Sequence, residues 1–69
     1  MFIKLTVTHT IVSGAGFHKN SSAHEELVNF EYVVKMIRGT DRNFTRIEMS
    51  DGSSFGVSET PEDITKQLK

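Results

Sequence analysis

Three histidines and a pair of glutamates are the residues whose types and spacing could support chemistry. His18 and His24 stand close to Glu25 and Glu26, and His9 lies further upstream. Neutral imidazole and carboxylate groups are competent ligands for zinc or nickel. Their spacing matches no established metal-binding motif, and solvated side chains in a polar stretch are the simpler interpretation. We therefore expect no metal site and no other cofactor.

A glycine-containing segment is the second candidate, because turns rich in glycine can present backbone N–H groups to an anion. The segment reads Ser13-Gly-Ala-Gly-Phe-His-Lys-Asn-Ser-Ser22 and lacks the glycine–lysine spacing of a P-loop. No nucleophile elbow is present, and a chain of 69 residues has little room for a cleft that excludes water. We expect turn glycines in a protein that is not an enzyme.

A basic stretch between residues 35 and 46 is the third candidate. Cations around an aromatic ring are typical of surfaces that bind single-stranded nucleic acid, and here they are Lys35, Arg38, Arg42 and Arg46 with Phe44. The whole chain opposes this interpretation, because 8 basic residues face 9 acidic ones. A solvated sheet edge, whose charges prevent strand pairing, is the competing interpretation.

Length and composition predict one small domain over residues 1–69. A core of this size supplies only about 3–5 kcal/mol of net stability, and without cysteine no disulfide can add to it. Self-association would add stability.

No apolar run reaches the ~20 residues that span a bilayer, and the alternating start is unlike a signal peptide. We expect a cytoplasmic protein with no membrane partner.

The first half of the chain predicts one strand, a long loop and a second strand. Ile3, Leu5 and Val7 share one face of a strand over residues 2–8, and Ile11 and Val12 either extend it or begin a second short strand. Residues 13–26 show no periodicity and are rich in turn formers, which predicts a long functional or mobile loop. A short turn from Asn29 to Tyr32 and a strand from Val33 follow, although a helical period also fits residues 30–37.

The final third carries the clearest local signals. After a turn over residues 39–43, two alternating strands flank Asp51-Gly52, which predicts a hairpin with a two-residue type I′ turn. Thr60, Pro61 and Asp63 then form the N-cap, first position and capping-box acid of a helix. Ile64 and Leu68 lie on one face of that helix and must dock on the sheet.

These elements resemble the small bacterial and phage proteins of the flagellar FlbD type. The matching residues are the opening Ile3-Lys4-Leu5-Thr6, the Val28-Asn29 element, the hairpin turn at Asp51-Gly52 and the stretch Val57-Ser-Glu-Thr-Pro-Glu62. The resemblance implies an uncharacterised phage or prophage relative without catalytic activity. It also implies an α+β fold: a small, antiparallel, strongly bent sheet, SH3-like or barrel-like, with a C-terminal helix.

Together these observations predict a non-catalytic accessory or regulatory protein of phage or bacterial origin, located in the host cytoplasm if phage-encoded. It would act through protein–protein contacts, including self-association, by a leftover apolar face or by the edge of the first strand. The alternative is a nucleic-acid-binding protein that uses the basic surface of residues 35–46.

Overall fold

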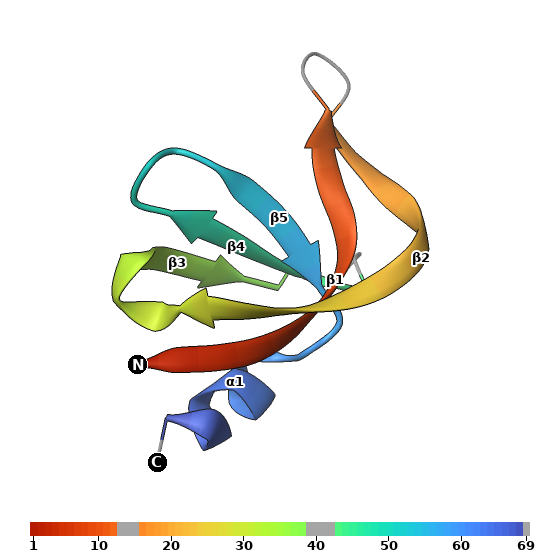
Figure 1. Ribbon diagram of the computed structural model, residues 1–69. Helices are drawn as coiled ribbons and strands as arrows, with labels where there is room; N and C mark the ends of the chain where they lie inside the picture. Colours follow the sequence, from red (N-terminus) through yellow and green to blue (C-terminus); the bar gives the residue numbers. More distant parts are fainter. Residues whose placement is uncertain (13–15, 39–42, 69) are drawn as a thin grey trace.

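The structure, a computed structural model, describes residues 1–12, 16–38 and 43–68. Within those ranges the strands form one five-stranded sheet in the order β2-β1-β5-β4-β3, and every neighbouring pair is antiparallel. A C-terminal helix lies beside β1 (Figure 1). The elements are β1 (Phe2–Val12), β2 (Gly16–Asn29), the 3-10 turn η1 (Phe30–Tyr32), β3 (Val33–Ile37), β4 (Thr45–Met49), β5 (Ser54–Val57) and α1 (Pro61–Gln67). The expected antiparallel sheet with a C-terminal helix is confirmed.

The core lies between one face of this sheet and α1. Side chains of β1 at alternating positions are buried there, as the alternation of residues 2–8 predicted. β1 continues from the predicted residues 2–8 to Val12, so Ile11 and Val12 extend this strand and do not begin a second one. The buried apolar cluster consists of Ile3, Leu5, Val7, Val28, Ile47, Val57 and Ile64.

The predicted loop over residues 13–26 is wrong for residues 16–26, which belong to β2 and pair with β1. Residues 13–15 lie outside the described residues. Apolar and polar residues alternate along a strand only where one of its faces is buried. In the described strand β2, Val28 is the one buried residue. β2 therefore carries almost no hydrophobic period, although its backbone is paired. Its pairing jumps from Val7–His24 to His9–Lys19, so that residues 20–23 bulge opposite Thr8.

The turn and strand predicted after Asn29 are both confirmed. The Asn29 side chain accepts a hydrogen bond from the Glu31 N–H and caps η1, and β3 begins at Val33. Val34 is an extra residue between the paired positions Val33 and Lys35. This bulge explains why strict alternation fails in this segment, which had left a helix as the competing interpretation. The predicted turn over 39–43 falls mostly outside the described residues.

The hairpin of β4 and β5 is confirmed, but its predicted two-residue type I′ turn is wrong. The Gly52 N–H donates to the Met49 carbonyl, and the Met49 N–H donates to the Ser53 carbonyl. The loop therefore contains Ser50, Asp51 and Gly52, the three-residue form in which one glycine closes the turn. Gly52 has a φ of 90°, whereas no described non-glycine residue has a positive φ. The Asp51 carboxylate accepts hydrogen bonds from the Ser53 N–H and hydroxyl, which favours this local turn.

The predicted helix start is confirmed in detail. The Thr60 hydroxyl accepts from the Asp63 N–H at 3.1 Å, and the Asp63 carboxylate accepts from the Thr60 N–H at 3.2 Å. Pro61 occupies the first helical position, where no N–H is needed. Ile64 is fully buried and Leu68 half-buried against the core, so α1 docks through the face that its spacing predicted.

Candidate functional site

The three histidines lie apart from one another in the sheet. His9 on β1 is opposite Lys19, and His18 on β2 is opposite Thr10. His24 places its Nε2 atom 2.6 Å from a Glu26 carboxylate oxygen on the exposed face of β2. Among the described residues, no group of three or more His, Asp or Glu side chains is arranged to hold a metal ion.

Two of the candidate nucleic-acid residues, Lys35 and Arg46, share a face of β3 and β4, because Lys35 is paired with Glu48, two residues from Arg46. Lys35 on β3 is exposed, and Arg38 at the end of β3 donates to the buried Thr45 hydroxyl at 3.2 Å. Arg46 on β4 lies 3.0 Å from the Glu48 carboxylate. Phe44 is buried, with only 8% of its surface exposed. Arg42 lies outside the described residues.

An aromatic cluster that the sequence did not predict joins the two hairpins. The rings of His9 and Phe44 stack with centroids 3.9 Å apart, and Phe17 tilts against Phe44 at 5.4 Å. The Arg46 guanidinium lies 5.2 Å from the centre of the Phe17 ring. A Cβ atom at Gly56 would lie 2.5 Å from the Phe44 ring. Gly56 between two apolar residues of a strand was the available signal, since such a glycine often marks a close approach.

This cluster has the properties of packing and not of acid–base catalysis. Burial, and secondarily the positive charge of Lys19, lower the pKa of His9 below its ordinary value. The imidazole is therefore neutral at physiological pH and stacks as an aromatic ring. A shallow hollow elsewhere, on α1, is lined by Pro61, Glu62, Thr65 and Lys66, and it lies apart from the cluster.

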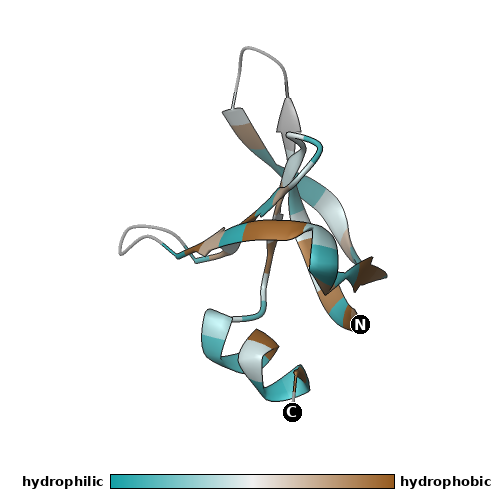
Figure 2. Ribbon diagram, turned by 90° about the vertical axis from the view of Figure 1, so that its left-hand side faces the viewer, coloured by the Kyte–Doolittle hydropathy of each residue, from teal (hydrophilic) through white to brown (hydrophobic). Residues whose placement is uncertain are grey.

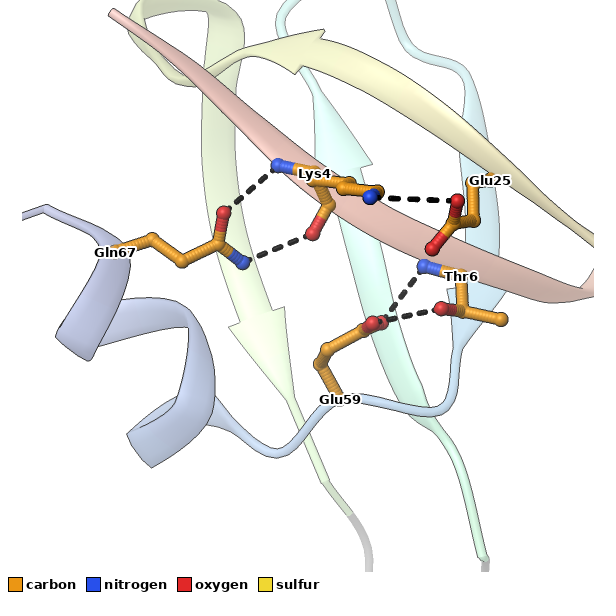
Figure 3. A network of polar contacts seen from close by, with 5 residues as sticks. All are labelled: Lys4, Thr6, Glu25, Glu59 and Gln67. Atoms are coloured by element: carbon orange, nitrogen blue, oxygen red, sulfur yellow. Dashed lines mark hydrogen bonds and ion pairs between the residues drawn. The ribbon is translucent and has the colours of Figure 1, made fainter.

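A polar network covers the first half of β1 on the side away from β2 (Figure 3). The Gln67 side-chain amide bonds both the N–H and the carbonyl of Lys4, each at 2.9 Å. The Glu59 carboxylate accepts from the Thr6 N–H and hydroxyl, each at 2.8 Å. The expectation that the edge of the first strand meets a partner is therefore wrong. β1 lies inside the sheet, and side chains of the α1 region occupy the backbone groups that β5 does not reach.

Large apolar side chains remain exposed at one end of the molecule. Phe2 is 64% exposed and Leu27 71%, and because Lys4 is paired with Leu27 they are diagonal neighbours on one face of β1 and β2. Figure 2 shows the hydrophobic colour at these two strand ends. The Phe30 N–H donates to the Met1 carbonyl and ties this end to η1 and β3. We call four of the exposed apolar residues the apolar rim: Phe2, Leu27, Tyr32 and Val34.

The chain matches no protein-family model, and neither the curated proteins nor the solved structures contain a match. No helix in the described part of the chain is long and apolar enough to cross a membrane.

Proposed function

We propose that this protein is a small, non-catalytic accessory or regulatory protein that acts through protein–protein contacts, self-association among them. The apolar rim is the observation that carries this proposal. Phe2, Leu27, Tyr32 and Val34 are each more than half exposed. Several large exposed apolar side chains on a small domain are typical of an interaction site.

We infer that the sheet is bent, SH3-like or barrel-like, and that this form brings the residues of the rim towards one another. η1 connects β2 to β3, which are the two edges of the described sheet. The edges of a flat five-stranded sheet would be about 19 Å apart. The chain from Asn29 to Val33 spans at most about 14 Å. The end of β2 and the start of β3 must therefore approach each other, which brings Leu27 towards Val34.

The geometry favours this function over nucleic-acid binding. Stacking on bases requires open aromatic faces beside a basic groove, whereas Phe44 is buried and Arg46 lies against Glu48. The resemblance to FlbD-type proteins, which are short and without known catalysis, supports an accessory role of phage or bacterial origin.

Site-specific photo-crosslinking in the cells that make the protein tests this proposal. A crosslinking side chain at Tyr32, on the rim, is expected to give discrete protein adducts that Phe2→Ser weakens. The same group at Thr65, exposed on α1, serves as the control. Equal labelling from Tyr32 and Thr65 would exclude the rim as the binding surface. Nucleic-acid adducts from a crosslinking group at Lys35, in place of protein adducts from Tyr32, would exclude it as well.

A further inference from the structure

The turn that joins β4 to β5 (Figure 1) contains a peptide bond whose two residues can react with each other. Asp51 is the one aspartate or asparagine of the chain that a glycine follows. Asp51 and Gly52 are both exposed, and a Cβ atom at Gly52 would meet no atom within 4 Å. Glycine has no side chain that would crowd its own nitrogen, and its backbone rotates more freely than that of any other residue. The Asp51 carboxyl group can therefore reach the nitrogen of Gly52 when the turn is open.

The reaction joins the carboxyl carbon of Asp51, Cγ, to the backbone nitrogen of Gly52. The nitrogen gives up its proton and the neutral carboxyl group gives up its hydroxyl, so that one water molecule leaves and a succinimide ring forms. Water then adds to one of the two ring carbonyls and opens the ring. Opening at Cγ restores aspartate, whereas opening at the former backbone carbonyl gives isoaspartate, in which the main chain runs through the side chain of residue 51. No other reagent takes part, and the product has the same atoms as the starting protein.

The folded turn holds both reacting groups in hydrogen bonds that oppose this reaction. The Oδ1 atom of Asp51 accepts from the Ser53 N–H at 2.9 Å and from the Ser53 hydroxyl at 2.6 Å. These bonds stabilise the ionised carboxylate, which loses an oxygen much less easily than the neutral acid does. The Gly52 N–H donates to the Met49 carbonyl at 3.0 Å, and this bond holds the proton that the reaction must remove.

The short loop of this turn also opposes the product. The Met49 N–H donates to the Ser53 carbonyl at 2.9 Å and closes a loop of three residues. Isoaspartate adds one carbon to the main chain inside that loop, and a hairpin's loop length determines how its closing hydrogen bonds form. The free carboxylate of isoaspartate is attached directly to Cα, so it no longer stands at the end of the side chain that reaches Ser53. The hairpin is therefore less stable after the reaction.

We propose that Asp51-Gly52 is a site of spontaneous isoaspartate formation that the β4–β5 turn protects in the folded protein. Protection ends when the hairpin opens, either locally or with the whole domain. The Asp51 carboxylate then loses its bonds to Ser53, and the Gly52 nitrogen loses its bond to Met49. The amount of isoaspartate at residue 51 thus reports how long the hairpin has been open. This inference goes beyond the proposed function and does not depend on the apolar rim.

Asp63-Ile64 is an internal control in the same chain. The Asp63 carboxylate accepts a hydrogen bond from the Thr60 N–H, and the Ile64 N–H donates to the Thr60 carbonyl. The β-branched side chain of Ile64 is stiff and crowds the nitrogen that would have to attack. We expect Asp63 to stay unmodified in the folded and in the unfolded protein. The comparison of the two aspartates separates the effect of the following glycine from the effect of unfolding.

Peptide mapping of the full chain tests the proposal. The protein is incubated at neutral pH in buffer and in concentrated guanidinium chloride, and electron-transfer fragmentation distinguishes isoaspartate from aspartate at each position. Isoaspartate at residue 51 is expected to form at least about tenfold faster in the denaturant than in buffer. Equal rates in the two solutions would overturn protection by the turn. A level at residue 51 no higher than at residue 63 in the denaturant would overturn the site itself.

Two variants separate the reactivity of the bond from its protection. Gly52→Ala places a methyl group beside the attacking nitrogen and is expected to slow the reaction at least about tenfold in the denaturant, where the fold plays no part. Ser53→Ala removes one donor to Asp51 and is expected to accelerate the reaction at least about threefold in buffer, with no change in the denaturant. Ser58→Ala, at an exposed serine outside the turn, is the matched control and is expected to change neither rate. A Ser53→Ala rate in buffer equal to that of Ser58→Ala would overturn protection by the Ser53 hydroxyl.

The stability of the modified protein gives a further measurement. The isoaspartyl form, separated by chromatography, is expected to unfold at a lower urea concentration than the original protein, because the closing bond from Met49 to Ser53 is displaced. Coinciding urea unfolding curves for the two forms would overturn the conclusion that the turn opposes the product.

Discussion

The two hairpins of this protein hold their strands together by different means. In the β4–β5 hairpin, strands of five and four residues are joined by a three-residue loop, and Ile47 and Val57 are fully buried. In the β1–β2 hairpin, strands of eleven and fourteen residues pair along their length, while most side chains of β2 are exposed. The β4–β5 hairpin is held by its turn and by burial, and the β1–β2 hairpin by backbone pairing along β1.

The difference shows what hydrophobic alternation reports. Alternation appears where one face of a strand is buried, as in β4, and it disappears where both faces meet water. A strand such as β2 satisfies its backbone by pairing with a neighbour that is itself held in the core. Its existence depends on β1 and not on its own side chains.

The contact between the two hairpins is expected to be the most sensitive point. Gly56→Ala would place a Cβ 2.5 Å from the Phe44 ring and 2.8 Å from the His9 Cβ. Both neighbours belong to the stacked cluster, so relief requires the ring or a strand to move. Overpacking of this kind costs about 1–3 kcal/mol, and we expect the upper part of that range in urea denaturation.

Phe44→Leu in the Gly56→Ala background is the control. The smaller side chain removes the ring atoms that meet the new methyl group and is expected to recover part of the lost stability. A free energy of unfolding within about 0.5 kcal/mol of the original protein for Gly56→Ala alone would contradict the close packing of the two hairpins.

The two glycines with positive φ, one in each hairpin, allow a matched comparison. Gly52 and Gly16 have φ angles of 90° and 79°, and an added Cβ would meet no atom within 4 Å at either position. Alanine at Gly52 is expected to cost about 1–2 kcal/mol of global stability through backbone strain alone. Met49 and Phe55, on either side of that turn, pack on the core, so the strain cannot be relieved locally.

Gly16→Ala introduces the same strain and is expected to cost less than half as much. Gly16 is exposed at the start of β2, far from the buried cluster, so the end of the strand can open without unfolding the core. Urea denaturation gives both global values, and amide exchange of Phe17 and His18 would reveal the local opening. A Gly16→Ala cost equal to that of Gly52→Ala would mean that the two hairpins unfold as one unit.

The sequence predicted those parts of the fold that local chemistry determines. Thr60, Pro61 and Asp63 specify a helix start whatever surrounds them, and Asp51-Gly52 specifies a reversal of the chain. The loop length at that reversal was wrong, because it depends on the side-chain bonds that Asp51 makes to Ser53. β2 was missed because tertiary pairing alone defines it. The aromatic cluster was missed for a similar reason, since His9, Phe17 and Phe44 come together only after both hairpins have formed.

The smallest expected effect is a pH dependence at the β4–β5 turn. The hydrogen bonds from the Ser53 hydroxyl and N–H lower the pKa of Asp51 below its ordinary value of 3.8. A carboxyl group whose pKa is lower in the folded state stabilises the fold above the unfolded-state pKa. That stability is lost as the pH falls through the folded-state pKa. The urea midpoint is therefore expected to fall slightly more between pH 5 and pH 2 in the original protein than in Asp51→Asn, because asparagine keeps an accepting oxygen but does not titrate. Identical acid profiles for Asp51→Asn and the original protein would show that the turn is held by Gly52 and the strand pairing, with no contribution from the Asp51 charge.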